Sequence, residues 1–113
     1  MNYRIVTTED FDKEVKALSK KYGSLKADLI AFQEKLLKNP TMGSDLGNNT
    51  RKVRMAIASK NKGKRGGARV ITYRFLIDVV NTKIYLLTIY DKGEQKNISE
   101  KEIKYLKEIN GLI

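Results

Sequence analysis

Residues 68–79 read Ala-Arg-Val-Ile-Thr-Tyr-Arg-Phe-Leu-Ile-Asp-Val, a long run rich in β-branched and aromatic residues. Such residues fit the pleated surface of a strand, and a run of this length predicts a strand at the centre of a sheet. The next four residues, Val80 to Lys83, predict a hairpin turn, and residues 84–90 (Ile-Tyr-Leu-Leu-Thr-Ile-Tyr) predict the returning strand. The centre of the fold is therefore expected to be antiparallel.

Another strand is predicted before this pair. Residues 52–57 (Lys-Val-Arg-Met-Ala-Ile) place apolar side chains at every second position, which is typical of a strand with one buried face. The opposite face carries Lys52 and Arg54. Residues 41–50, which are rich in Gly and Asn, and residues 59–67 (Ser-Lys-Asn-Lys-Gly-Lys-Arg-Gly-Gly) predict loops on either side of this strand.

The N-terminal third predicts a short strand at residues 3–7, followed by two helices. Thr7 or Thr8 can cap the first helix. Apolar residues recur at helical spacing in two stripes, Phe11, Val15, Leu18 and Tyr22, then Leu25, Leu29, Phe32 and Leu36. Gly23 ends the first helix and Ser24 can cap the second, so the two helices are expected to form an antiparallel hairpin.

A capping box gives the clearest local signal and predicts a last helix. Ser99 and Glu102 have the spacing of the box, and Ile98 and Ile103 have the spacing of a hydrophobic staple. The apolar face of this helix is predicted to comprise Ile103, Leu106 and Ile109.

These elements follow the order β-α-α-β-β-β-α within one domain, residues 1–113. The order predicts an α+β fold in which two helices pack on a small, mainly antiparallel twisted sheet. Because helices would cover one face of the sheet, we expect the other face to carry the cationic side chains Lys52 and Arg54.

The positive charge of the chain is concentrated in one window. Residues 46–77 contain no acidic residue but hold nine of the 23 Lys and Arg residues. The remaining 14 nearly balance the 13 acidic residues, so the net charge of +10 comes almost wholly from this window. Such a zone indicates binding to a polyanion. For the lysines of residues 59–67 taken singly, a solvated basic loop is the alternative interpretation.

The composition also excludes several kinds of site. The chain has no His and no Cys, which removes disulfides, thiolate zinc sites and the commonest general base. Asp91 and Glu94 form only a weak candidate for a metal pair, so we expect no metal and no cofactor. No apolar run approaches the ~20 residues of a membrane span, and the first residues do not read as a signal peptide. We therefore expect a cytoplasmic protein with no membrane partner.

Antiparallel pairing of the last two strands would bring Tyr90 and Lys92 close to Arg69. A Tyr hydroxyl, several Lys and an Arg on a strand are sufficient for RNA cleavage without a metal. A base takes the 2′-OH proton, cations stabilise the transition state, and an acid protonates the leaving 5′-oxygen. Since free Lys and Tyr have pKa values of about 10, neighbouring cations must tune the base. For Tyr90 the sequence alone favours the alternative, packing against the C-terminal helix.

Three segments, together with the element order, resemble the RelE/ParE superfamily of bacterial toxins. They are residues 52–57, 60–73 and 85–94, and their most specific parts are Gly-Gly-Ala-Arg-Val-Ile-Thr-Tyr at 66–73 and Tyr-Asp-Lys at 90–92. The resemblance covers essentially the whole chain and is greatest to the HigB-type branch of RelE-like proteins.

The resemblance implies the toxin of a type II toxin–antitoxin module. Such a toxin is a ribosome-dependent endonuclease that cuts mRNA in the A site without a metal, leaving a 2′,3′-cyclic phosphate and a 5′-OH. The implied partners are mRNA, the ribosome and a cognate antitoxin. The antitoxin often carries a helix-turn-helix domain, and the toxin would contact operator DNA only through the antitoxin.

The resemblance also assigns roles by position. Arg69 matches the arginine that stabilises the transition state, and Tyr90 is a candidate substitute for a catalytic tyrosine whose position holds Asn97 here. The expected catalytic residues are Arg69, Arg54, Lys60, Lys62, Tyr90 and Lys92, and the expected RNA-binding residues are Lys52, Lys64 and Arg65.

Two other functions remain open from the sequence. ParE-like relatives inhibit DNA gyrase and cleave no RNA. A non-enzymatic protein that binds RNA or the ribosome would have the same concentrated charge, and its binding would depend strongly on salt.

Overall fold

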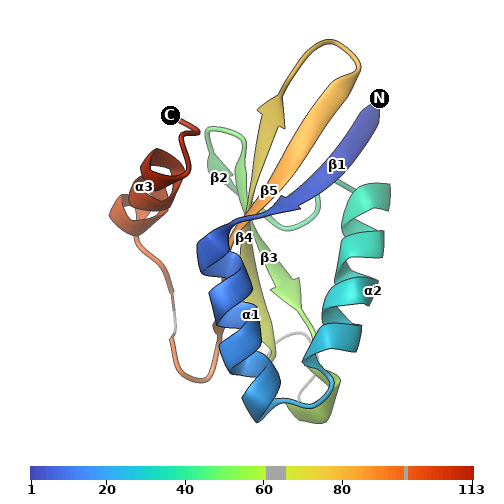
Figure 1. Cartoon of the computed structure of the whole chain (residues 1–113), viewed down its shortest axis with the longest axis vertical. Helices are drawn as coiled ribbons and strands as arrows, with labels where there is room; N and C mark the ends of the chain where they lie inside the picture. Colours follow the sequence, from blue (N-terminus) through green and yellow to red (C-terminus); the bar gives the residue numbers. More distant parts are fainter. Residues whose placement is uncertain (61–65, 96) are drawn as a thin grey trace.

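The computed structural model describes residues 1–60, 66–95 and 97–113. They form a five-stranded sheet with three α-helices (Figure 1). In chain order the elements are β1 (Asn2–Thr7), α1 (Glu9–Lys21), α2 (Leu25–Lys38), β2 (Ser44–Gly47), β3 (Thr50–Met55), the short 3-10 helix η1 (Ala58–Lys60), β4 (Ala68–Leu76), β5 (Asn81–Asp91) and α3 (Glu100–Ile109). None of the helices in this described part is long and apolar enough to cross a membrane.

The sheet has the strand order β1-β5-β4-β3-β2. β1 runs parallel to β5, and the other neighbouring strands are antiparallel. The parallel pair is possible because all the elements from α1 to β4 lie between β1 and β5 in the chain, which exceeds the long connection that parallel strands need. β4 lies at the centre of the sheet, so both the predicted central strand and the α+β class are confirmed.

The predicted helical hairpin is also confirmed. The hydroxyl of Thr8 caps α1 by accepting a hydrogen bond from the backbone N–H of Phe11 at 3.1 Å. α1 and α2 run in opposite directions along the sheet (Figure 1). Ser24 precedes α2 but makes no capping bond. Its hydroxyl is bonded instead to Asp28 and Ser59, which ties α2 to η1.

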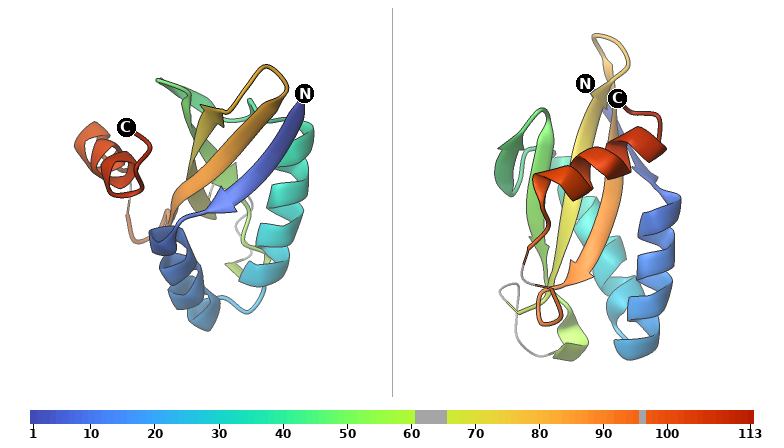
Figure 2. Two further views of the ribbon diagram at one scale, coloured as in Figure 1. Left: turned by 45° about the horizontal axis from the view of Figure 1, so that its top comes forward. Right: turned by 90° about the vertical axis from the view of Figure 1, so that its left-hand side faces the viewer.

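Both faces of the sheet carry an apolar core. The larger one lies beneath α1 and α2 and includes Phe11, Phe32, Val53, Val70 and Ile84. The second contains Ile71, Leu87, Ile103 and Leu112. Figure 2 shows α3 lying across the sheet on the side away from α1 and α2. The expected cationic face is therefore only partly open, because apolar residues of β4 and β5 extend to that face and α3 covers them.

Two turns differ from the sequence prediction. The predicted loop at residues 41–50 contains β2, which joins β3 through Asn48 and Asn49. Both asparagines have positive φ angles, 52° and 60°, which is the geometry of a two-residue type I′ turn. The β4–β5 turn lies at residues 77–80, earlier than predicted, because the carboxylate of Asp78 accepts hydrogen bonds from the N–H groups of Val80 and Asn81.

The capping box of α3 is confirmed, since Ser99 and Glu102 bond reciprocally at its first turn. Ile98 packs in the same cluster as Ile103, as the staple predicted. Ile109 is wrongly predicted to face the sheet, because its side chain is 49% exposed. The buried position of the last turn belongs instead to Lys107.

Candidate functional site

Three of the predicted site residues form a row across the sheet. Arg54 on β3 is paired with Arg69 on β4, and Arg69 is paired with Tyr90 on β5. Residues directly opposite each other point to the same face, with Cβ atoms about 5 Å apart. The predicted proximity of Tyr90 to Arg69 is therefore confirmed, and Arg54 extends the same row.

The members of this row differ in burial, and their electrostatics differ accordingly. Arg54 is exposed, whereas Arg69 and Tyr90 are each only 6% exposed. Burial lowers the pKa of Arg69, and the neighbouring Arg54 lowers it further, although an arginine remains protonated at neutral pH. Like charges directly opposite destabilise a sheet, so an anion that bound beside Arg54 and Arg69 would reduce their mutual repulsion.

Tyr90 has a hydroxyl suited to a ligand. Burial raises its pKa, and the charge of Arg69 opposes that shift, so the phenol is protonated at neutral pH. The hydroxyl is buried and finds no hydrogen-bond partner within the described segments. A buried donor left without a partner costs about 1–3 kcal/mol, and an incoming acceptor would recover this energy.

A buried ion pair lies at the end of β5, on the face of the sheet opposite to the row, because Asp91 follows Tyr90 and successive side chains of a strand point to opposite faces. Lys60 Nζ lies 2.6 Å from Asp91 Oδ1, and the two side chains are 9% and 1% exposed. Asp91 also accepts hydrogen bonds from the Tyr22 hydroxyl at 2.6 Å and from the backbone N–H of Gly93 at 2.9 Å. Burial alone would raise the pKa of Asp91, but these bonds lower it to about 2. Asp91 is therefore a charged anchor that holds Lys60 beside β5.

The two carboxylates weighed as a metal pair are thus occupied by lysines. Glu94 forms a hydrogen-bonded ion pair with Lys21, and Asp91 is bound by Lys60. Within residues 1–60, 66–95 and 97–113, no three His, Cys, Asp or Glu side chains are grouped so as to hold a metal ion.

The remaining predicted site residues are placed as follows. Lys52 precedes Arg54 by two positions on β3, and its Nζ donates to Asn97 Oδ1 at 3.3 Å. The backbone N–H of Lys92 donates to the carbonyl of Gly67 at 3.1 Å, which keeps it beside the start of β4. Lys62, Lys64 and Arg65 lie outside the described residues.

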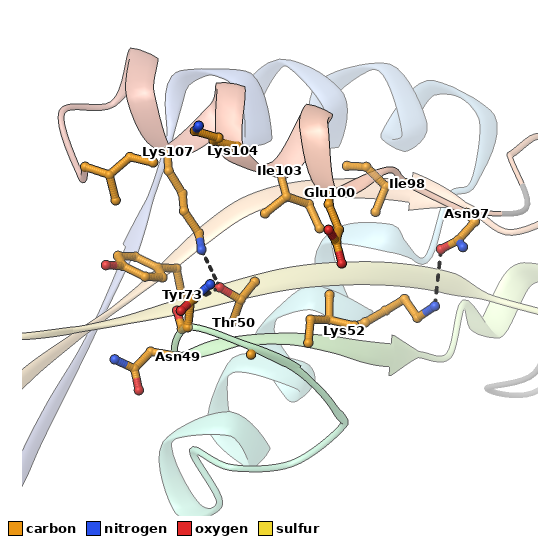
Figure 3. Close-up of a pocket in the computed structure, with 14 residues that line it drawn as sticks. Asn49, Thr50, Lys52, Tyr73, Asn97, Ile98, Glu100, Ile103, Lys104 and Lys107 are labelled. Carbon is orange, nitrogen blue, oxygen red and sulfur yellow. Dashed lines mark hydrogen bonds between the residues drawn. The ribbon is translucent and has the colours of Figure 1, made fainter.

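A groove that the sequence did not reveal lies beside this row, between α3 and the β2–β3 hairpin (Figure 3). Its volume is about 910 Å³. Lys107 of α3 lines it, donates to Thr50 Oγ1 at 2.6 Å and stands 4.6 Å from the centre of the Tyr73 ring. The signal available in the sequence was spacing, because Lys107 follows Ile103 by four positions and so shares its helix face.

Comparison with known families decides the class of the protein. Residues 3–113 match the model of the RelE toxin of the RelE/RelB toxin–antitoxin system. The chain belongs to the RelE toxin family. It is the toxin of a toxin–antitoxin system, as the resemblance implied, and its family implies an antitoxin as a partner. Toxins of the RelE family are generally endoribonucleases, which is the class of activity that the row of Arg54, Arg69 and Tyr90 is suited to perform.

Proposed function

We propose that this toxin is a metal-independent endoribonuclease that cleaves mRNA in the ribosomal A site. The observation that carries the proposal is the cross-strand row of Arg54, Arg69 and Tyr90. It combines two cations with an unoccupied hydroxyl donor on adjacent strands, where rigid backbone fixes their separation. RNA cleavage by its own 2′-OH requires these components, since positioning and electrostatic stabilisation supply most of the rate.

In the proposed reaction, the 2′-oxygen attacks the neighbouring phosphorus and the bond from phosphorus to the 5′-oxygen breaks. Arg69 stabilises the charge that develops on the phosphoryl oxygens, and its burial strengthens this interaction because water screens it less. Arg54 holds the same phosphate from the exposed side. Tyr90 protonates the leaving 5′-oxygen, so the products are a 2′,3′-cyclic phosphate and a 5′-OH.

The proton of the 2′-OH needs a separate acceptor. We assign this role to the side chain of Lys62 or Lys64, acting as the neutral amine, with Lys92 as an electrostatic partner. Lys60 is assigned a positioning role, because an ammonium group that donates to a buried carboxylate is poorly placed to take a proton. Lys52 and Arg65 are proposed to bind the RNA backbone.

The test is Arg69→Ala in cells that express the toxin without antitoxin. We expect growth arrest to be abolished, because the loss of one transition-state donor lowers a rate by about 10²–10³. Arg4→Ala is the matched control, since Arg4 is an exposed arginine on the edge strand β1. Thermal unfolding of both variants separates loss of activity from loss of the fold.

Reverse transcription of mRNA from arrested cells identifies the target. Discrete 5′ ends at fixed codon positions support the proposal. Intact mRNA accompanied by DNA damage would instead favour inhibition of DNA gyrase, and a folded Arg69→Ala variant that remains fully toxic would refute the site.

A further inference from the structure

The groove between α3 and the β2–β3 hairpin is closed at each end by a lysine that bridges its two walls (Figure 3). At one end Lys107 of α3 reaches Thr50 on β3, at 2.6 Å. At the other end Lys52 of β3 reaches Asn97, which precedes α3, at 3.3 Å. Both ammonium groups therefore lie at the groove, although they come from opposite walls.

Lys107 is an unusual residue for a helix that packs on a sheet. It is 7% exposed, and it forms no ion pair with any carboxylate of the described residues. Its neighbours are the neutral hydroxyl of Thr50 and the ring of Tyr73, and its burial lowers its pKa. Buried charges are normally paired, so the position indicates that an anion supplies the missing countercharge.

The lining of the groove combines the three features that a nucleotide requires. Lys104 joins Lys52 and Lys107 as a third cation, and Glu100 is the one acidic side chain among the described lining residues. The wall contributed by α3 carries Ile103, against which a base can pack. Asn49 and Asn97 also line the groove, and side-chain amides can donate to and accept from base edges.

The groove is continuous with the proposed catalytic row. Lys52 and Arg54 lie on the same face of β3, two residues apart, and thus about 7 Å apart along the strand. A single strand of RNA with one phosphate at Arg54 and Arg69 would reach Lys52 with the adjoining nucleotide. A volume of about 910 Å³ also lies within the range of small-molecule sites, about 300–1,000 Å³.

We propose that this groove binds the nucleotide of single-stranded RNA next to the scissile phosphate. One phosphate of this nucleotide would lie at Lys52, the following phosphate at Lys104 and Lys107, and the base between Ile103 and the residues Asn49 and Asn97. The inference rests on the proposed RNA substrate but adds a site for base selection. The base preference of cleavage would then be set by Asn49 and Asn97 rather than by the catalytic row.

The first test measures binding without cleavage. Arg69→Ala toxin serves as the background, and the probe is a fluorescent six-nucleotide single-stranded RNA followed by anisotropy from 50 to 200 mM salt. Removal of one phosphate contact lowers the slope of log K against log salt by about 0.7. We expect this loss for Lys104→Ala and for Lys107→Met, and no change for Lys101→Ala, an exposed lysine of the same helix outside the groove lining.

Lys107→Met preserves the packing volume beside Tyr73, and thermal unfolding of each variant checks the fold. A salt slope that is equal for Lys104→Ala, Lys107→Met and Lys101→Ala overturns the proposal. The proposal is also overturned if Lys104→Ala and Lys107→Met bind RNA normally but bind the antitoxin more weakly, because the groove would then be an antitoxin-binding site.

The second test uses the active toxin. Asn97→Ala and Asn49→Gly should each change which codons are cut. Glycine is chosen at position 49 because Asn49 has a positive φ of 60°, which glycine tolerates. An unchanged cleavage pattern in both variants refutes base selection by the groove. Failure of the unaltered toxin to cut mRNA, with RNA binding and its salt slopes as expected, would refute the proposed activity but leave the groove as an RNA site.

Discussion

Replacement of Asp91 by Asn should destabilise the protein strongly and in a pH-dependent manner. Asp91 is buried, and it accepts hydrogen bonds from Lys60, the hydroxyl of Tyr22 and the backbone N–H of Gly93. Lys21 Nζ lies 3.6 Å from the same carboxylate, but the Lys21 side chain is 50% exposed. An amide retains the shape and one acceptor but loses the charge, so Lys60 is left buried without a countercharge.

The size of the effect follows from two considerations. Removal of one partner from a buried ion pair costs about 3–5 kcal/mol. Separately, lowering the pKa of Asp91 from 3.8 to about 2 corresponds to about 2 kcal/mol of stability. We therefore expect Asp91→Asn to lower the free energy of unfolding by about 3 kcal/mol at pH 7. For a domain of this size the melting temperature should fall by on the order of 10 °C.

The pH dependence has a definite sign. A carboxyl group whose pKa is lower in the folded state stabilises the fold above its unfolded pKa, near 4, and loses that contribution as the pH falls towards 2. The difference between wild type and Asp91→Asn should therefore narrow between pH 4 and pH 2. Urea denaturation followed by circular dichroism measures it at each pH.

Asp45→Asn is the matched control. Asp45 is paired with Arg51 at 3.8 Å, but its side chain is 65% exposed, and exposed pairs contribute about 0–1 kcal/mol. A double-mutant cycle with Lys60→Met isolates the coupling to Asp91. The reasoning is refuted if Asp91→Asn costs no more than Asp45→Asn, or if its effect is the same at pH 7 and pH 2.5.

Three further predictions concern individual residues. Ser99→Ala removes the capping bond of α3 and should lower the free energy of unfolding by about 1 kcal/mol in urea denaturation; no change would show that the cap is unimportant. Gly67→Ala would place a Cβ 2.2 Å from the carbonyl oxygen of Met55, so we expect severe destabilisation on thermal melting. Gly23→Ala, which meets no atom within 4 Å, should melt much nearer to wild type, and equal melting temperatures would contradict the argument. Tyr90→Phe should leave stability unchanged or raise it by about 1 kcal/mol while slowing mRNA cleavage by about 10²-fold or more; full activity would exclude Tyr90 as the acid.

Local sequence was sufficient for most of the elements of this fold. The spacing of apolar residues predicted α1 and α2, and the capping box predicted α3. It failed at β2, because Asn48 and Asn49 occur in loops and in type I′ turns alike, and only pairing with β3 distinguishes the two. It also misplaced the β4–β5 turn, where the Asp78 carboxylate fixes the backbone.

The candidate site was predicted in part for a similar reason. Pairing of two predicted strands was enough to place Tyr90 beside Arg69. Lys107 was missed because a lysine on a helix is normally solvated, and its burial becomes visible only when α3 is placed on the sheet. Asp91 was likewise considered only as a weak metal ligand, because its partner Lys60 lies 31 positions earlier in the chain.

The sequence by itself determined the concentration of charge, the absence of His and Cys, and, apart from β2, the order of strands and helices. These properties are additive or local, so they need no knowledge of distant contacts. Tertiary structure alone decided which cations work together. It binds Lys60 to Asp91 across 31 positions and Lys107 to Thr50 across 57. Those contacts depend on strand register and helix packing. They place the cations in three different settings, which are the proposed catalytic row, the buried ion pair of Lys60 with Asp91, and the groove.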